Sequence, residues 1–537
     1  MHTHLKPILV AVVAAFWSLP LMAQPADHGG VKEKIGSVRF QVSCVADVQP
    51  KFNRAMALYH SFHWTESTKA FNEIAQLDPR CGMAYWGLAM ISADNPFAWP
   101  VSLNLKEGPQ FIAKAKEIGA GSQRERDYIE ALDLLYSDHA NTPHRARALR
   151  YEEAMGKLAE RYPNDLEATI LYGLAISANH DLSDGTYARP LKAAALLEPL
   201  FKAHPDHPGV PHYIIHSYDY PPIAQKGIEA AQRYAKVAAD APHAQHMPSH
   251  IFTRVGYWRE SVAANQASIA ASQGNVRSIA HASDYMVYAY LQLADDAAAE
   301  SVWAEMRKVP GVKSATQTES FAFAAMPARL ALERGRWADA AKVELHPSIV
   351  EADWQRLPQA LANVVFARAL GAARSGDAVA ARKEIARLRE LQATLTQRKI
   401  EYWAEQVDIQ ANIATAWALR AEGKNDEALA AMRVAANQED KTEKHVVSPG
   451  PLLPARELLG DMLMELGQAG EALKHYEASL GKEPNRFRGL YGAALAAERS
   501  GDKARARVHY EKLAANTAQS TSARPELGRT RQVLAQR

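Results

Sequence analysis

Apolar residues recur every three to four positions along most of this 537-residue chain, whereas the two-residue alternation typical of β-strands is scarce. Segments such as GPQFIAKAKEIG, RERDYIEALDLLY and LEATILYGLAIS each place their apolar residues along one helical face. Polar stretches such as NHDLSDGTY separate them and indicate loops. The pattern therefore predicts an almost entirely helical protein.

A longer period of 34 residues is clearest towards the C-terminus. LPARELLGDMLMELGQAGEALKHYEASLGKEPN begins at Leu453, and FRGLYGAALAAERSGDKARARVHYEKL follows at Phe487. This is the period of the tetratricopeptide repeat (TPR), in which two helices form each unit. We therefore predict an all-α, TPR-type helical solenoid, a superhelix of stacked antiparallel helix pairs. Its later units are expected to start near positions 208, 242, 280, 321, 362, 409, 453 and 487.

The N-terminus has the features of a signal peptide. Lys6 precedes a largely apolar run that ends at Leu21, and we expect cleavage after Ala23. This run is shorter than the ~20 residues that span a bilayer. We therefore expect a periplasmic or secreted protein without a membrane span after cleavage. The expected organisation is a signal peptide (1–23), a leading segment (24–47), an irregular TPR solenoid with a histidine-rich groove (48–445), C-terminal TPR repeats (446–520) and a tail (521–537).

Charge and cysteine usage narrow the possible functions. Lys and Arg total 62 and Asp and Glu total 60, a balance that argues against a nucleic-acid partner. The two cysteines, Cys44 and Cys81, flank the first repeat, and in an exported protein we expect them to form a disulfide. Two buried free thiols are the alternative. No GxGxxG, phosphate-binding loop, HExxH or GxSxG motif occurs.

Nine of the 20 histidines fall between His180 and His281. Within this stretch two pairs have members four residues apart, so each pair shares one helix face. The second pair follows the first by 34 residues, which predicts equivalent positions on neighbouring repeats. Neutral imidazoles one turn apart chelate transition metals, and we expect Zn, Cu or Fe here if any cofactor is bound. The candidate ligands are His212, His216, His246 and His250.

Each of these histidines, taken singly, has a plainer interpretation as polar surface or as a buried residue satisfied by backbone carbonyls. We interpret His60 and the histidines of the other helices in this structural way. The shared 34-residue phase of the two pairs is what favours a functional site.

Several stretches of the chain resemble a widespread, largely uncharacterised family of bacterial TPR proteins, many of them exported. The matching segments are SFHWTESTKAFNEIAQLDPRCGMAYWGLAM, HPGVPHYIIHSYD, HMPSHIFTRVGYW, HASDYMVYAYLQ, AMPARLALERGRWADA and PGPLLPARELLGD, which together span roughly residues 40–515. HPGxxHxxxH and HMPSHI are the most specific of these motifs. The resemblance implies the solenoid fold and a concave histidine site, and it supplies no reaction.

TPR arrays place the first helix of each pair on the concave surface, and this family feature implies which other residues face the groove. The expected ligand-binding residues are His243, Arg254, His281, Asp219, Arg329 and Glu333. If the site is catalytic, Asp284 and Tyr288 are the candidates for proton transfer. Pro248 is expected in the first turn of its helix, where a missing N–H is tolerated.

Three functions remain open at this point. The first, which we favour, is an exported protein whose histidine-lined groove binds a peptide, a protein segment or a small molecule, in combination with a transition metal. The second is a metal-dependent hydrolase or oxidoreductase that uses the same residues. The third is an envelope scaffold that binds a partner protein without metal.

Overall fold

The computed structural model describes residues 33–312 and 314–536, and regular structure in this part of the chain is almost entirely α-helical. The expected signal peptide (1–23) and the residues up to 32 lie outside the described residues. Among the helices of the described part, none is both long and apolar enough to cross a membrane. The predicted all-α class is confirmed.

The helices follow one another with short connections. The first group is α1 (Val48–His60), α2 (Trp64–Leu77), α3 (Gly82–Ser92), η1 (Pro96–Ala98), α4 (Gly108–Ile118), α5 (Gln123–Tyr136), α6 (His144–Arg161), α7 (Leu166–Ala178) and α8 (Ala188–Ala203). The middle group is α9 (Gly209–Tyr218), η2 (Ala224–Gly227), α10 (Ile228–Val237), α11 (Pro242–His246), α12 (Pro248–Arg254), α13 (Trp258–Ala271), α14 (Val276–Gln292), α15 (Asp296–Met306) and α16 (Gln317–Leu332). The last group is α17 (Trp337–Ala340), α18 (Glu351–Arg356), α19 (Pro358–Arg374), α20 (Ala378–Gln397), α21 (Glu401–Ala421), α22 (Asn425–Glu439), α23 (Ala455–Glu465), α24 (Ala469–Lys482), α25 (Phe487–Arg499), α26 (Lys503–Asn516) and α27 (Pro525–Ala535).

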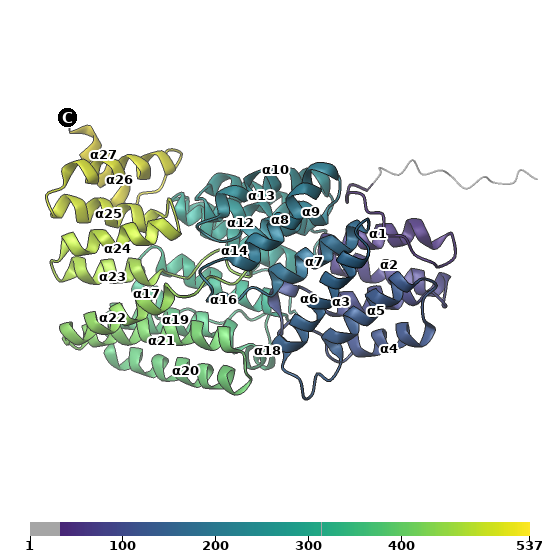
Figure 1. The fold of residues 1–537 in the computed structure, drawn as a ribbon. Coiled ribbons are helices and arrows are strands. Elements are labelled where there is room, and N and C mark those ends of the chain that lie inside the picture. Colours follow the sequence, from purple (N-terminus) through teal and green to yellow (C-terminus); the bar gives the residue numbers. More distant parts are fainter. Residues whose placement is uncertain (1–32, 313, 537) are drawn as a thin grey trace, which may run out of the picture. The chain divides into compact units, whose positions relative to one another are not determined.

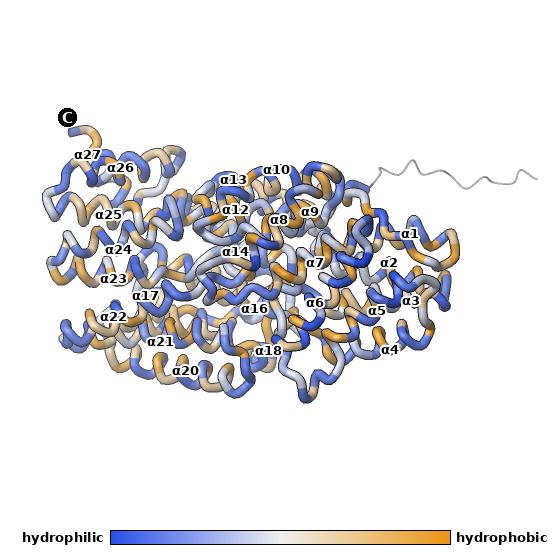
Figure 2. The backbone as a smooth tube through the Cα atoms, viewed as in Figure 1, coloured by the Kyte–Doolittle hydropathy of each residue, from blue (hydrophilic) through white to orange (hydrophobic). Residues whose placement is uncertain are grey.

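Neighbours in sequence are neighbours in space. Each helix from α19 to α26 packs against the next one, and α14, α16, α19 and α21 also pack in series as the first helices of successive pairs. Figure 1 shows these hairpins side by side, and Figure 2 shows apolar and polar residues alternating along them. A chain of hairpins that contact mainly their neighbours is a solenoid. The fold is the predicted TPR-type helical solenoid.

The expected repeat starts agree with the first helices of the pairs at several places. Those at 242 and 487 coincide with the starts of α11 and α25, and the one at 208 precedes α9 by one residue. The start expected at 409 falls inside α21, which begins at Glu401. That segment, EYWAEQVDIQANIATAWALR, is apolar on several faces, so its periodicity alone does not mark the helix N-terminus.

The clearest repeats are held together by an aromatic ring between two glycines. Tyr476 of α24 packs against Gly460 of α23 and Gly492 of α25, where an added Cβ would lie 2.8 and 2.4 Å from the ring. Its hydroxyl donates to Asp461 Oδ1 at 2.6 Å. The small residues let adjacent helices approach closely, which explains the Gly and Tyr positions of the 34-residue pattern.

Replacing Gly492 by alanine should therefore destabilise the C-terminal repeats. The added methyl overlaps the buried Tyr476 ring, and such overpacking costs about 1–3 kcal/mol. Gly481→Ala is the matched control, because a Cβ at Gly481 meets no atom within 4 Å and a helical Gly→Ala change favours folding by roughly 0.5–1 kcal/mol. Urea unfolding followed by circular dichroism measures the free energy of unfolding of both variants. Equal effects of the two substitutions would contradict this packing.

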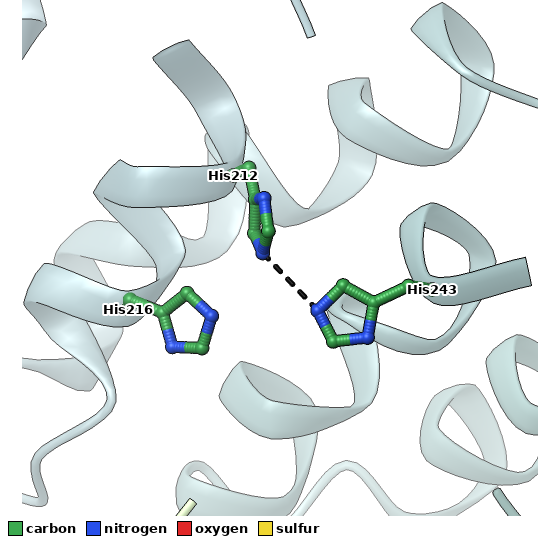
Figure 3. Close-up of side chains that lie close together, drawn as sticks. All are labelled: His212, His216 and His243. Atoms are coloured by element: carbon green, nitrogen blue, oxygen red, sulfur yellow. Dashed lines mark hydrogen bonds between the residues drawn. The ribbon is translucent and has the colours of Figure 1, made fainter. Parts of the chain in front are cut away.

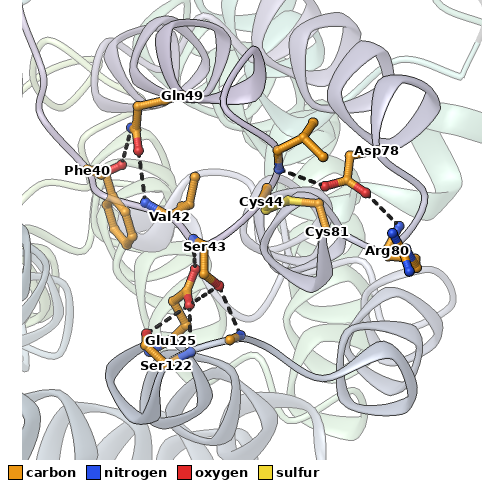
Figure 4. The surroundings of a disulfide bond; sticks show 12 residues. Phe40, Val42, Ser43, Cys44, Gln49, Asp78, Arg80, Cys81, Ser122 and Glu125 are labelled. Atoms are coloured by element: carbon orange, nitrogen blue, oxygen red, sulfur yellow. Dashed lines mark hydrogen bonds between the residues drawn. A yellow bond between two sulfur atoms is a disulfide. The ribbon is translucent and has the colours of Figure 1, made fainter.

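The disulfide expected between Cys44 and Cys81 is present, with a Cα–Cα distance of 5.1 Å. It attaches the leading segment to the N-terminus of α3, next to hydrogen bonds that join the same segment to α2 and α5 (Figure 4). The Ser43 N–H donates to Glu125 Oε1 at 2.7 Å, and the Val45 N–H donates to Asp78 Oδ2 at 3.0 Å. Residues 38–42 also bury apolar side chains. The leading segment is thus part of the packed fold from Lys34 onward.

Two large apolar cores fill the described part of the chain. One is built from residues between Ile35 and Phe252, and the other from residues between Ala280 and Tyr510. Helices α9, α11 and α12 contribute to the first core, and α14 contributes to the second. The histidine-rich stretch therefore lies where the two cores meet.

Towards the C-terminus the expected tail, 521–537, contains α27, which packs on α26. Arg524 lies buried before this helix and forms an ion pair with Asp296. Residues from Lys34 onward form one compact unit. The boundaries expected at 446 and 521 are thus positions within one unit.

Candidate metal centre

Six histidines from four helices gather into two groups. The first group is His212, His216 and His243, and the second is His246, His250 and His281. In each group one ring nitrogen from every member lies within 4.8 Å of the others. Four of the six side chains are buried, and His243 and His281 are half-buried.

The first group joins one turn of α9 to the start of α11. His212 Nε2 lies 3.2 Å from His243 Nε2, and His216 presents its ring from the next turn of α9 (Figure 3). Neither ring nitrogen of His216 has a hydrogen-bond partner among the described residues. Its ring instead stacks on Phe97, with centroids 3.8 Å apart. The nitrogens of His216 are therefore unengaged next to two other imidazoles.

The second group lies around an interruption in the helical hydrogen bonds. Proline has no N–H to continue the helical ladder, and Met247, whose backbone is still helical, separates α11 from α12. Pro248 occupies the first turn of α12, as expected, while the short α11 carries His243 and His246. Across this interruption His246 Nε2 and His250 Nε2 lie 3.0 Å apart. His281 of α14 completes the group, its ring 4.3 Å from that of His246.

The hydrogen bonds behind His246 and His250 determine where their protons lie. His246 Nδ1 is 2.6 Å from Asn265 Oδ1, and the Asn265 amide is oriented because its nitrogen donates to the Ser261 carbonyl. His250 Nδ1 is 2.9 Å from Asp219 Oδ2. Both Nδ1 atoms are therefore donors. In the neutral rings both Nε2 atoms carry lone pairs, and these face each other at 3.0 Å.

Two lone pairs cannot form a hydrogen bond, so this contact is favourable when a cation lies between the nitrogens. Two nitrogen ligands at about 2.0–2.1 Å from one metal ion are separated by roughly 3.3–3.4 Å at the tetrahedral angle. The His212–His243 spacing of 3.2 Å is close to this value, and the His246–His250 spacing of 3.0 Å is shorter. His212 is oriented in the same way, since its Nδ1 donates to the His60 carbonyl at 2.6 Å.

Protonation of these histidines is unfavourable because the site is buried. Burial lowers the pKa of His246 well below its usual value, and the nearby His250 lowers it further. Burial likewise lowers the pKa of His250 and brings that of His212 to about 3. The imidazoles are thus neutral at pH 7, which is the form that binds metal ions.

A third cluster has a structural role. Glu167 accepts hydrogen bonds from His60 Nε2 and His207 Nε2, each at 2.8 Å. The other ring nitrogens are also engaged, His60 Nδ1 with the Tyr213 hydroxyl and His207 Nδ1 with the Gly209 N–H. No nitrogen is left to bind an ion. The cluster holds the segment whose His60 carbonyl orients His212, which agrees with the structural interpretation of His60.

A pocket of about 260 Å³ opens beside the two groups. His216 and His243 of the first group and His250 and His281 of the second line it. Phe62 also lines the pocket and stacks on His243 with ring centroids 5.3 Å apart. A small molecule in this pocket would thus reach ligands of both groups.

A segment that is distant in sequence covers this region. Residues 444–451, here called the strap, attach at one end through Lys444, whose ammonium lies 3.2 Å from Asp219 Oδ2. Burial lowers the pKa of Lys444 to about 8, so it remains charged at pH 7. The Tyr285 hydroxyl lies within 3.2 Å of the carbonyl oxygens of Val446 and Ser448. The strap therefore lies against Tyr285, whose ring contacts His246 and His250.

Arg329 attaches the other end of the strap. Its guanidinium pairs with Asp284 at 2.9 Å and donates to Ser448 Oγ and to the carbonyls of Gly450 and Pro451. Both members of the ion pair are completely buried. Residues 448–451 are thus held against Arg329 of α16.

No family model matches this chain, and no curated protein matches it. Among solved structures the chain is similar to one in the APC/C hetero-tetramer Cut9–Hcn1, with 11% identity over 92% of this chain and 77% of that chain and a TM-score of 0.37. It is also similar to the human IFIT1 dimer with m7Gppp-AAAA, with 11% identity over 87% of this chain and 89% of that chain and a TM-score of 0.37. It is also similar to the P58(IPK) TPR domain, with 13% identity over 91% of this chain and 99% of that chain and a TM-score of 0.20. These scores carry no argument about the site.

The other residues expected at the site have partners within the protein. Asp219 accepts from Arg254 Nε at 2.8 Å and lies behind His250. Tyr288 and Glu333 both contact the buried guanidinium of Arg486, at 2.7 and 2.9 Å. Direct contacts of a ligand with Asp219, Arg254, Arg329, Glu333, Asp284 or Tyr288 remain predictions from the sequence.

Several residues that shape the site were not found from the sequence. Asn265 lies in α13, the second helix of its repeat, and Phe97 lies in the NPF turn. Neither residue belongs to a sequence pattern comparable to the spacing of the histidine pairs. Lys444 lies almost 200 residues beyond His250. The sequence also did not predict which histidines group together. His243 and His281 were expected to bind a ligand, and each lies here in one of the two groups of three.

Removing the Arg329 charge should loosen the strap and lower stability. Arg329→Met leaves the Asp284 carboxylate buried without its partner, a change that costs about 3–5 kcal/mol. Asp284→Asn in the same chain should restore part of this loss. Urea unfolding of the two single variants and the double variant measures the coupling. A double variant as unstable as the sum of both single changes would show that Arg329 and Asp284 do not stabilise each other.

Proposed function

We propose that this chain is an exported TPR protein that binds transition-metal ions at two three-histidine sites and a small ligand in the adjoining pocket. The sites are His212, His216 and His243, and His246, His250 and His281. The solenoid fold fits the coarser role of a binding scaffold, since stacked repeats build extended binding surfaces. The metal sites add a specific chemistry to that role.

One observation carries the proposal. His246 and His250 have their protons held on Nδ1 by Asn265 and Asp219, so that two bare Nε2 atoms meet at 3.0 Å. Such a contact is repulsive in a buried, neutral site unless a cation lies between the nitrogens. Hydrogen-bonded residues behind the ligands, as Asn265 and Asp219 are here, are typical of metal centres.

The ligand chemistry limits the choice of ion. Imidazole nitrogens suit Zn, Cu and Fe, whereas Mg and Ca prefer oxygen ligands. Three protein ligands leave part of the coordination sphere open, as at catalytic metal sites. The open side adjoins the 260 Å³ pocket, where a small molecule or the end of a peptide would bind. Turnover of that ligand is the second candidate function, and the open coordination position is the feature that favours it.

Metal analysis tests the proposal directly. The protein purified from the periplasm without a histidine tag should contain one ion in each group. His216→Ala and His281→Ala are the most informative single variants, because the ring nitrogens of His216 and the Nδ1 of His281 have no hydrogen-bond partners among the described residues. Each should lose about one ion per chain while it keeps the helical circular dichroism spectrum.

The double variant should fall to background metal content. His346→Ala is the matched control: His346 is also buried and stacked, on Phe323, but lies outside both groups. It should keep the wild-type metal content. A wild-type protein that remains metal-free after reconstitution with Zn, Cu and Fe would reject the proposal and favour the metal-free scaffold.

A further inference from the structure

We propose that the two three-histidine sites form one dinuclear copper centre that binds dioxygen between its two ions. This inference rests on the proposed function, because it requires both sites to hold metal. It adds the identity of the metal, the coupling of the two sites and the class of ligand. Three features support it: the distance between the groups, the charge of the ligand set and the opening to the pocket.

The two groups are close enough to share one small ligand. The rings of His216 and His250, from different groups, have centroids 5.9 Å apart, and those of His243 and His246 are also 5.9 Å apart. These spacings are similar to those within a group, such as 4.9 Å between His246 and His250. Both groups open on the same pocket. A diatomic molecule in the pocket would thus contact ions at both sites.

The charge of the site favours monovalent ions. All six candidate ligands are histidines, and none is a carboxylate. The nearest carboxylate, Asp219, faces the rear nitrogen of His250 and is already paired with Arg254 and Lys444. At the pocket wall Arg277 is likewise paired with Asp94. Two divalent ions would bring four uncompensated positive charges into a buried site, whereas two Cu(I) ions bring half as many.

Copper also suits the ligands themselves. Among divalent first-row metals, copper binds nitrogen ligands most strongly, and imidazole is one of its usual protein ligands. Cu(I) accepts three nitrogen ligands without an additional anion, which leaves its open side towards the pocket. Phe62 and Phe97 stack on His243 and His216 of the first group, and Phe62 also lines the pocket.

The binding step balances in electrons and charge. Each Cu(I) gives one electron, the two electrons pass to one dioxygen molecule, and the product is a dioxygen dianion held between two Cu(II) ions. The oxygen–oxygen bond remains, and no proton is needed. The centre carries two positive charges before and after the step. A site without carboxylate ligands therefore undergoes no change in its net buried charge, and release of dioxygen reverses the step.

The test uses the full mature protein, loaded with Cu(I) in the absence of air. Metal analysis first establishes whether each group holds one copper. On exposure to dioxygen we expect uptake of one dioxygen for every two copper ions and a new near-ultraviolet charge-transfer absorption. We also expect no Cu(II) signal in electron paramagnetic resonance, because the two unpaired electrons couple through the shared ligand.

Failures of the two proposals are distinguishable. Two copper ions per chain without dioxygen uptake, or with the full signal of two independent Cu(II) ions, would overturn the dinuclear centre and leave the metal sites in place. The same holds if the protein takes up zinc in both groups and rejects copper. A protein that binds no metal rejects both proposals.

Variants provide the matching controls. His281→Ala should hold a single copper, take up no dioxygen, and show one Cu(II) signal after chemical oxidation. His346→Ala should behave as the wild type. Dioxygen uptake by His281→Ala that equals the wild-type value for each copper would overturn the requirement for two ions.

Discussion

The orientation of His250 is the constraint on which the candidate centre depends. Asp219 holds the ring by its Nδ1, and the same carboxylate binds Arg254 and Lys444. One buried group therefore connects a helix of the histidine site to the strap. Because the carboxylate is shared among three partners, it cannot move towards one without weakening its bonds to the others. Burial opposes ionisation of Asp219, but Lys444 and Arg254 hold its pKa well below the usual value.

The fold and the two histidine pairs could be predicted because they depend on local periodicity. A spacing of four residues places His212 beside His216, and a spacing of 34 places the second pair on the next repeat. The packing of Tyr476 between two glycines follows from the same 34-residue pattern. These relations involve one helix or two adjacent hairpins, so the sequence contains the necessary information.

The composition of the two groups could not be predicted, because it depends on tertiary geometry. His243 of α11 approaches His212 of α9 across two different helices, 31 residues apart in the sequence. Arg329 was expected to bind a ligand and Asp284 to transfer protons, and both remain predictions. Arg329 also contacts the strap, and nothing local to it indicates that residues 444–451 return to this place. Contacts between segments more than 100 residues apart leave no periodic signal.

The position of the histidines between the two apolar cores has a mechanical consequence. His212, His216, His243, His246 and His250 belong to helices of the first core, whereas His281 belongs to α14 of the second. An ion held by His246, His250 and His281 would therefore crosslink the two cores, as the Cys44–Cys81 disulfide crosslinks the leading segment to α3. The protein would then have one covalent crosslink near its N-terminus and one coordinative crosslink at its centre, the second of which a chelator can open without any reductant.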